Sequence, residues 1–182
     1  ELARSIETIV HGTTVTTNAV LTGTGAKTGL LTTQGVRDAL EMRRGVREEQ
    51  YNNRYTNVTP LVPRYLRMPV RGRLNYRGDA ITPLNLEDVR LAVRRFKEEQ
   101  VDAVAICFMN SFANAEHEEA AAKIVREELP GVFLTVSSDF LPSIRFYDRV
   151  STTVLNSYVG PTFSSYVDQL LARLREIGFG GV

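Results

Sequence analysis

The sequence predicts an α/β protein whose mostly parallel or mixed sheet is flanked by helices. Short apolar runs alternate with longer segments in which apolar residues recur at helical spacing, and this alternation is typical of βαβ units. The run "VDAVAICFM" is almost entirely apolar, as expected of a strand covered on both faces. A stretch rich in arginine and proline, residues 46–84, interrupts the alternation, and we interpret it as an insertion.

The first 45 residues predict two strands and two short helices. "SIETIVH" is a β-rich run, and "TTNAVLTG" after it predicts one or two helical turns that end at Gly23. "AKTGLLTT" predicts a second strand between glycines, and "GVRDALEMRRG" predicts a short helix that ends at Gly45. We therefore expect Ile9 and Leu31 to lie on strands of the central sheet.

The insertion predicts a β-hairpin rather than a helix. Its residues show no helical period, and two extended runs flank the turn sequence "NYRGD". Its arginines suit carboxylates and phosphates, which they bind through two parallel hydrogen bonds. They can equally pair with nearby glutamates or with another subunit. Among the arginines around this insertion we take Arg44 as a candidate binding residue.

The second half of the chain continues the alternation of helices and strands. Asn85 and Asp88 resemble a capping box at the start of a helix, and Asn114 can cap the next helix. "VDAVAICFM" and "GVFLTVSS" predict strands, so we expect Ile106 and Leu134 in the same sheet as Leu31.

A long helix is predicted over residues 151–178. Apolar side chains recur there at helical spacing, and Pro161 marks either the first turn of this helix or a kink.

Composition excludes several classes of protein. A net charge of +1 gives no general attraction to nucleic acid or membranes, and no apolar run is long enough for a membrane helix. One cysteine, Cys107, allows no internal disulfide, and we expect it to be buried and inert in a reducing compartment. No signal peptide is visible, and the chain starts with glutamate, so we expect an excised piece of a longer cytoplasmic protein.

Known nucleotide and metal motifs are not spelled out. The sequence "TGTGAKTG" imitates half of a phosphate loop, but its Lys27 leads into a predicted strand, so we interpret it as a connector. The two histidines, His11 and His117, show no spacing that would form a metal site. The sequence "HEE" from His117 to Glu119 reads as a solvated helix face.

Polar groups gather in "HGTTVTTN", residues 11–18. We expect His11 at the end of a strand, where α/β proteins hold their ligands, with Gly12 allowing close approach to the backbone. The other polar residues of this stretch offer hydrogen-bond donors; they are Thr13, Thr14, Thr17 and Asn18. The same groups can instead cap a helix, and the residues alone leave both interpretations open. A second polar site holds Asp148 and Arg149, which can form a structural ion pair or a catalytic one.

Together and in this order, these motifs resemble the hydantoinase A/5-oxoprolinase family. The resemblance covers nearly the whole chain and rests on "HGTTVTTNAVL", "GAKTGLLTTQGVRDALEMRRG", "PLVPRYL", "VDAVAICFMNSFANAEHE" and "SSDFLPSIRFYDRVSTTVLNSYVGP". It implies an RNase-H-like fold of the actin, sugar-kinase and Hsp70 group. Residues 1–182 would then form part of the family's N-terminal domain, without the phosphate loop that family members carry upstream.

The resemblance also implies a function. Family members use ATP and Mg²⁺ to open hydantoin or 5-oxoproline rings, activating the amide by phosphorylation, and they work with a hydantoinase B-like subunit in a hetero-oligomer. The substrate would be a small cyclic amide. Two alternatives remain: a subunit of an ATP-dependent ketone carboxylase of the acetone or acetophenone type, or a non-catalytic scaffold domain. The isolated chain is expected to be inactive and to show no evident cofactor site.

The resemblance assigns roles to the candidate residues. His11, Thr13 and Thr14 become catalytic candidates that face the active cleft. The candidates for binding substrate or nucleotide are Gly12, Thr17, Asn18, Arg44, Asp148 and Arg149, and no residue is expected to bind a metal.

Overall fold

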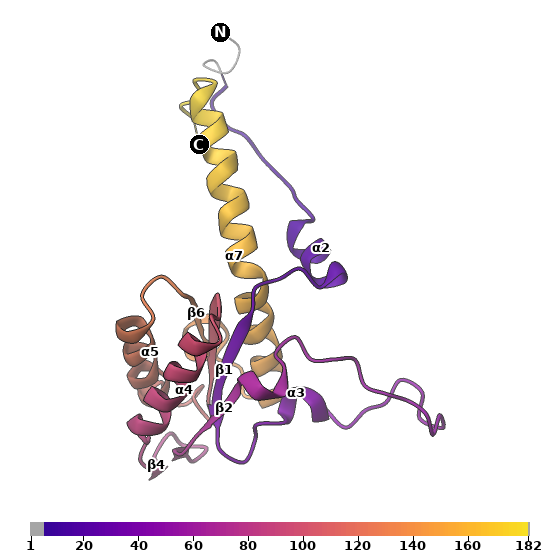
Figure 1. The fold of residues 1–182 in the computed structure, drawn as a ribbon, viewed down its shortest axis with the longest axis vertical. Helices are drawn as coiled ribbons and strands as arrows, with labels where there is room; N and C mark the ends of the chain where they lie inside the picture. Colours follow the sequence, from indigo (N-terminus) through magenta and orange to yellow (C-terminus); the bar gives the residue numbers. More distant parts are fainter. Residues whose placement is uncertain (1–5, 182) are drawn as a thin grey trace.

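The computed structural model describes residues 6–181 and confirms an α/β fold with a parallel sheet between helices (Figure 1). Four parallel strands lie in the order β2-β1-β5-β6. Their bounds are β1 (Thr28–Thr33), β2 (Arg67–Val70), β5 (Ala103–Cys107) and β6 (Phe133–Val136). Leu31 pairs with Ile106, and Val104 pairs with Leu134, so three of the four predicted strands are confirmed.

The predicted strand around Ile9 is wrong. Residues 6–14 form no strand or helix and run beside the last helix down to the first one, and Ile9 is 37% exposed. A strand needs a neighbour that satisfies its backbone groups. Within the described residues, this segment does not pair with an edge of the sheet. Its β-branched residues favour an extended backbone, but they cannot form a strand without a neighbouring strand.

Helices cover both faces of the sheet. α4 (Leu86–Glu98) and α5 (Glu116–Glu128) pack on one face, and α7 (Phe146–Glu176) packs on the other (Figure 1). The short helices α2 (Val15–Thr22), α3 (Ala39–Met42) and α6 (Ser137–Phe140) contact α7. Gly29 allows α4 to pack closely, because a Cβ there would lie 2.6 Å from the ring of Phe96. The core between the layers is apolar and includes Leu30, Leu31, Val93, Phe96, Val104, Ile106, Val125 and Val154.

Two of the predicted helix ends are confirmed, and others differ in detail. Gly23 ends α2 in the left-handed region at φ 67°, and Asn85 caps α4 by accepting the N–H groups of Glu87 and Asp88. The reciprocal half of the capping box is absent because the Asp88 carboxylate binds Arg71 instead. α3 ends at Met42, before the predicted Gly45.

α5 begins later than the sequence pattern predicts. The side chain of Asn114 accepts the N–H of Glu116 at 2.9 Å, and the helix starts there, with Ala115 as its capping residue.

The arginine-rich segment is only partly an insertion. Arg67–Val70 forms the edge strand β2 of the main sheet, which the sequence pattern did not predict. The predicted hairpin is confirmed as β3 (Arg73–Leu74) and β4 (Ala80–Thr82), whose turn is held by the Asn75 side chain. A short 3-10 turn, η1 (Arg64–Leu66), precedes β2.

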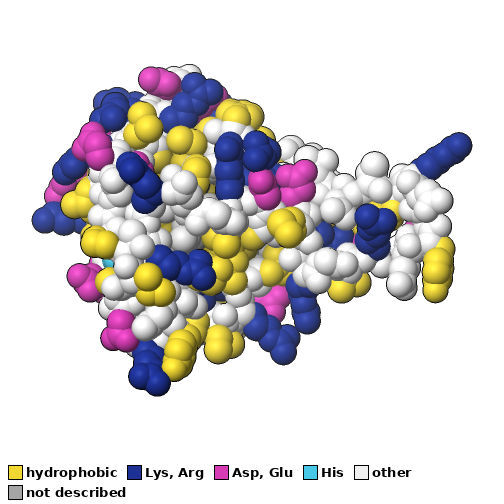
Figure 2. Space-filling model, turned by 90° about the horizontal axis from the view of Figure 1, so that it is seen from below, with side chains coloured by type: hydrophobic (Ala, Val, Ile, Leu, Met, Phe, Trp, Pro, Cys, Tyr) yellow, Lys and Arg dark blue, Asp and Glu magenta, His cyan; other side chains and the backbone are white. Residues whose placement is uncertain are grey.

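Residues 46–59 protrude from the domain as a loop (Figures 1 and 2), and the chain returns to the core at the buried Val62. Figure 2 looks onto the domain from below and shows basic, acidic and apolar side chains interspersed on that face.

The last helix starts earlier than predicted, at Phe146, and continues without a break through Pro161 to Glu176. The interpretation of Pro161 as a first-turn residue is therefore wrong. The first half of α7 buries Val150 and Val154 against the sheet, whereas the second half projects beyond the domain and exposes Phe163 and Leu171 (Figure 1).

Cys107 is fully buried, as predicted, and burial raises the pKa of its thiol to about 12. This thiol therefore stays protonated and unreactive near neutral pH.

Candidate functional site

The stretch at residues 11–14 leads into the N-terminus of α2. Thr14 is the N-cap residue, but its side chain makes no capping bond and instead accepts the Asn18 amide at 3.5 Å. The Thr13 hydroxyl accepts the N–H of Val15 at 3.2 Å, which leaves its own proton available for donation. Capping of α2 therefore accounts for one hydrogen bond of Thr13. The hydroxyl groups of Thr13 and Thr14 remain exposed to solvent and can donate.

His11 contacts the far half of α7. Its Nε2 lies 2.5 Å from the hydroxyl of Tyr166, and the two rings stack with centroids 5.7 Å apart. The predicted position of His11 at the end of a strand is therefore wrong. His11 itself remains exposed to solvent.

The whole stretch lies on the amino-end side of the sheet. α7 runs antiparallel to the strands: Arg149 bonds to Phe108 beyond the carboxyl end of β5, whereas the Tyr158 carbonyl accepts the N–H of Ala26 just before β1. Tyr166, which holds His11, lies still farther along α7. The expectation that these residues gather where parallel strands end is overturned, because the strand expected to carry them does not form.

Gly12 shows no steric need for glycine within the described chain. A Cβ at Gly12 would have no heavy atom within 4 Å, and its φ lies outside the left-handed region. The space around this backbone is open, so a ligand or a further part of the protein can approach it closely.

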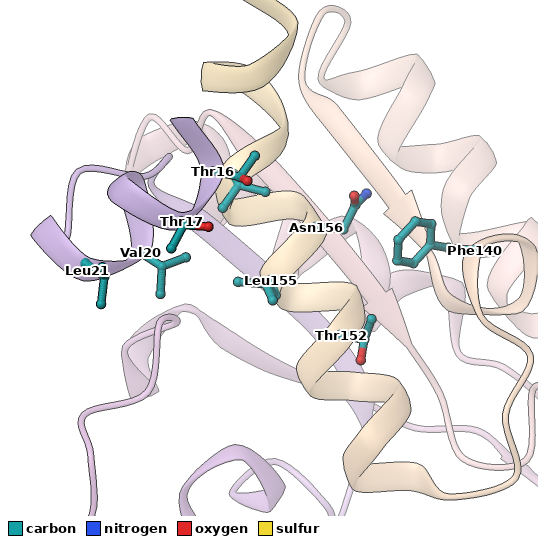
Figure 3. Close-up of a pocket in the computed structure, with 9 residues that line it drawn as sticks. Thr16, Thr17, Val20, Leu21, Phe140, Thr152, Leu155 and Asn156 are labelled. Carbon is teal, nitrogen blue, oxygen red and sulfur yellow. The ribbon is translucent and has the colours of Figure 1, made fainter. Parts of the chain in front are cut away.

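A pocket of about 430 Å³ lies between α2 and α7 (Figure 3). Thr17, one of the predicted residues, lines it from α2, and Figure 3 shows Thr16 and Thr17 on the side of α2 turned toward α7. The other lining residues are Val20, Leu21, Phe140, Thr152, Leu155, Asn156 and Val159. The sequence pattern did not predict this pocket, because its two walls come together only when α2 packs on α7.

Arg44 and Asp148 stand apart from this pocket. Arg44 is exposed and lines a separate cavity of about 200 Å³ with Arg43, Val46 and Tyr147. Asp148 is half-buried in the first turn of α7, and within the described residues it forms no ion pair.

Arg149 is fully buried and does not pair with Asp148, so the expected ion pair is wrong. Its Nη1 donates to the Ser143 carbonyl at 2.5 Å, and its Nη2 donates to the Phe108 carbonyl at 2.6 Å. The guanidinium also lies 5.7 Å from the ring centres of Phe112 and Phe146. These contacts give Arg149 a structural role next to the carboxyl end of β5.

Glu118 is a buried carboxylate that the sequence analysis placed on a solvated face, and that interpretation is wrong. It is 0% exposed, and it accepts the N–H of Phe108 at 2.7 Å, the Ser137 hydroxyl at 2.7 Å and the N–H of Ser138 at 2.8 Å. The neighbouring His117 is also buried, and this burial lowers the pKa of its imidazole. No local pattern in "HEE" could reveal these contacts, because every partner of Glu118 is distant in sequence.

A cavity of about 490 Å³ with both charged and apolar lining residues lies near the carboxyl ends of β1 and β2. Arg37, Asp38 and Arg64 line it, and the Arg64 side chain donates to Asp38 at 2.9 Å. This hydrogen bond holds the pKa of the Asp38 carboxyl below its usual value. The cavity was not among the predicted sites.

Among residues 6–181, no group of three or more His, Cys, Asp or Glu side chains is arranged to hold a metal ion. Over the same range, no helix has the length and apolar character to cross a membrane.

Comparisons with known proteins found a matching family model and several similar proteins. A family model described as the hydantoinase/oxoprolinase N-terminal region matches residues 2–129. Caprolactamase subunit alpha of Pseudomonas jessenii is 40% identical over 180 residues, which cover 98% of this chain and 26% of that protein. The acetophenone carboxylase gamma subunit of Aromatoleum aromaticum is 31% identical over 194 residues, covering 100% of this chain and 26% of that protein.

The fold is similar to a solved structure as well. The crystal structure of the ATP-dependent caprolactamase from Pseudomonas jessenii superposes with a TM-score of 0.93 at 40% identity, over 98% of this chain and 26% of that one. The chain therefore spans about a quarter of the length of these relatives.

Proposed function

Because the chain belongs to the hydantoinase/oxoprolinase family through residues 2–129, we propose that it forms part of an ATP-dependent enzyme that opens a cyclic amide ring. The main support is the likeness to ATP-dependent caprolactamase, at 40% identity and a TM-score of 0.93 across 98% of this chain. Since the chain spans 26% of that relative, the activity is proposed for a longer protein that contains it.

The exposed donors before α2 suit the charge that this reaction develops. ATP would supply a phosphoryl group to the amide oxygen, which makes the carbonyl carbon easier for water to attack. Negative charge then builds on oxygen atoms, and the N-terminus of a helix together with hydroxyl donors stabilises such charge. Thr13 and Thr14 offer these donors, Gly12 allows close approach, and the exposed imidazole of His11 lies next to them in the chain.

The roles of the other predicted residues follow from their places. Thr17 faces the pocket between α2 and α7, and we propose that it contacts the substrate. Asn18 holds Thr14 through its side-chain amide, so it acts by positioning that hydroxyl. Arg44 and Asp148 lie away from this pocket, and Arg149 is occupied by backbone carbonyls. For these three residues we propose support of the domain or of a neighbouring part of the protein.

Mg²⁺ has no candidate set of ligands among the described residues. We assign no metal-binding role to residues 6–181.

A companion subunit is part of the proposal. Similar proteins are named as subunits, one alpha and one gamma, which supports a hetero-oligomeric enzyme. We propose a hydantoinase B-like partner and a cytoplasmic location, where the buried Cys107 would remain reduced.

The second candidate function is ATP-dependent carboxylation of a ketone. It is supported by 31% identity to the acetophenone carboxylase gamma subunit across the whole chain. In that case the same donors would stabilise an enolate oxygen rather than an amide oxygen. A non-catalytic scaffold role is the third alternative, and the protruding loop at residues 46–59 would serve it.

A turnover assay of the full-length protein with its companion subunit separates these functions. ADP release is measured with a panel of lactams, hydantoins and 5-oxoproline, and in parallel with acetone or acetophenone plus bicarbonate. We expect ADP release that depends on a cyclic amide and produces the ring-opened amino acid. Ketone-dependent ADP release would support the carboxylase. If neither the cyclic amides nor the ketones stimulate ADP release, both enzymatic proposals would be contradicted.

A further inference from the structure

The cavity near the carboxyl ends of β1 and β2 has the size and the position of a small-molecule site. Its volume of about 490 Å³ lies within the range of ligand pockets in proteins. Residues 34–39, which follow β1 directly, supply most of its lining. Parallel α/β sheets hold their ligands beyond the carboxyl ends of the strands. The threonines before α2 lie on the amino-end side of the sheet, so this cavity is a separate candidate site.

The charged side chains that line this cavity are Arg37, Asp38, Arg43 and Arg64. Arg64 binds both carboxylate oxygens of Asp38, through Nε at 2.9 Å and through Nη2 at 3.0 Å. Arg43 forms an ion pair with Glu48. Within residues 6–181, these pairs leave Arg37 as the cation of the lining that has no carboxylate partner.

The guanidinium of Arg37 is held in place, but the fold does not satisfy all of its donors. Its Nη2 donates to the Arg64 carbonyl at 2.7 Å. Its Nε is buried without a hydrogen-bond partner in the described part of the chain, and its Nη1, which is not buried, also forms no hydrogen bond there. An anionic oxygen at Nη1 would therefore gain a charge-assisted hydrogen bond from a group whose orientation is already fixed.

Apolar side chains line much of the remaining cavity, and they are Val36, Ala39, Met42 and Pro69. Met42 is 71% exposed, so a ligand that covers it removes apolar surface from water. A simple inorganic anion would contact Arg37 and leave this apolar surface uncovered. An anion with an apolar body would use both parts of the lining.

The balance of charge favours a ligand with a single negative charge. Arginine binds carboxylates and phosphates alike, so the guanidinium alone does not choose between them. A phosphate monoester carries close to two negative charges near neutral pH, whereas a carboxylate carries one. A second charge would find no further unpaired cation in the lining and would be repelled by the carboxylate of Asp38, which lines the same cavity.

We infer that this cavity binds a small monocarboxylate with an apolar body. Arg37 binds the carboxylate, and the apolar residues after β1, together with Pro69 on β2, contact the body of the ligand. The inference goes beyond the proposed ring opening and does not depend on it, because none of its residues belongs to the stretch before α2 or to the pocket between α2 and α7.

A matched set of probes tests the charge and the apolar body separately. Benzamide has nearly the shape of benzoate without its charge, acetate has the charge without the ring, and phenyl phosphate has the ring with more charge. Isothermal titration of the full-length protein near neutral pH should show that benzoate binds about tenfold more tightly than each of the other three. Equal affinity for benzoate and benzamide, or for benzoate and acetate, would overturn the inference. Tighter binding of phenyl phosphate, or no detectable binding of benzoate, would overturn it as well.

A variant of Arg37 locates the binding site. Arg37→Gln removes the charge, so it should raise the Kd of benzoate at least about tenfold and leave that of benzamide unchanged. Arg37→Lys should recover part of the affinity because it returns the charge. Arg94→Gln is the matched control, since Arg94 is exposed on α4 and does not line the cavity. An unchanged Kd of benzoate in Arg37→Gln, or an equal rise in Arg94→Gln, would overturn the inference.

Met42 provides a second test that decides the question even if Arg37→Gln fails to fold. Met42 is the last residue of α3 and is largely exposed, so substitutions there should preserve the fold. Met42→Glu places a negative charge beside the bound carboxylate and should raise the Kd of benzoate about tenfold. Met42→Gln has nearly the same shape without the charge and should raise it only about twofold. Equal effects of the two substitutions, or no effect of either, would overturn the inference.

Discussion

Glu118 and Arg149 hold opposite ends of the same residue's backbone. The Glu118 carboxylate accepts the Phe108 N–H at 2.7 Å, and the Arg149 guanidinium donates to the Phe108 carbonyl at 2.6 Å. Both side chains are 0% exposed, and they form no ion pair with each other. The chain directly after β5 is thereby fixed between two buried charges of opposite sign, one supplied by each helical layer.

Glu118→Gln should destabilise the fold strongly. The new amide would place donors opposite the N–H of Ser138 or of Phe108, and a buried donor without an acceptor is costly. We expect the free energy of unfolding to fall by about 2–4 kcal/mol in urea denaturation. Glu119→Gln, an exposed neighbour on the same helix, should change it by less than about 0.5 kcal/mol. Equal effects of the two changes would show that the buried hydrogen bonds of Glu118 do not contribute measurably to stability.

The stability of the fold should depend on pH through the Asp88 carboxyl group. Hydrogen bonds from Arg71 hold the pKa of the Asp88 carboxyl below its usual value of 3.8. A depressed folded-state pKa stabilises the fold above the unfolded-state value, and this contribution disappears as the pH falls through the folded-state value. We therefore expect Asp88→Asn to lower the Tm near neutral pH, and the difference from wild type to close below about pH 4.

The control for Asp88 is Asp168→Asn, on the exposed second half of α7. Its Tm difference from wild type should stay small at every pH. A difference for Asp88→Asn that is as large at about pH 3 as at pH 7 would show that packing, and not charge, causes it.

The threonines before α2 should matter more for turnover than for stability. Thr14 makes no capping bond with its side chain, and Thr13 makes a single bond of 3.2 Å, so alanine at either position should cost about 1 kcal/mol or less. In the full-length enzyme each change should lower turnover by on the order of a hundredfold if the hydroxyl faces the developing charge.

His11→Ala extends the same comparison. The bond to Tyr166 positions the imidazole, so Tyr166→Phe should reproduce part of the loss of turnover. Normal turnover in the Thr13, Thr14 and His11 variants, each compared with its own Tm, would reduce this stretch to a structural element.

The 182-residue chain alone should bind Mg-ATP weakly. In the connector that imitates a phosphate loop, Gly25 packs against the ring of Tyr158, and Lys27 donates to the Glu99 carbonyl at 2.6 Å and to its carboxylate at 3.0 Å. These contacts use the connector within the fold, and Lys27 points to Glu99. We expect a Kd above about 1 mM in isothermal titration. A tight site with one nucleotide per chain would show that other described residues bind ATP.

The sequence predicted those elements whose signal is local. Leu31, Ile106 and Leu134 lie in continuous apolar runs, and such runs form strands wherever helices cover both faces. The run around Ile9 has similar composition but no adjacent strand among the described residues, and composition cannot supply a partner. β2 was not predicted, because Arg67 and Pro69 interrupt the apolar pattern that is typical of a strand. An edge strand nevertheless tolerates proline.

The candidate site was predictable only in part, because its walls come from separate segments. The threonine pattern identified Thr17, yet Asn156 and Leu155 meet it only after α2 packs on α7. Glu118 was misjudged for the same reason: its charge looks solvated until the ends of β5 and β6 supply three donors. Hydrophobic period reports which face of an element is buried and says nothing about which polar group is buried with it.

Because α7 is long, a small change in its tilt produces a large displacement at its far end. Arg149 anchors its start, and Tyr166 reaches His11 seventeen residues later, a span of about 25 Å along a helix axis. A tilt of only about 5° at the anchored end would move Tyr166 by about 2 Å. Small displacements where Arg149 meets the sheet would thus be magnified at His11, while the pocket residues midway along the helix would move about half as far.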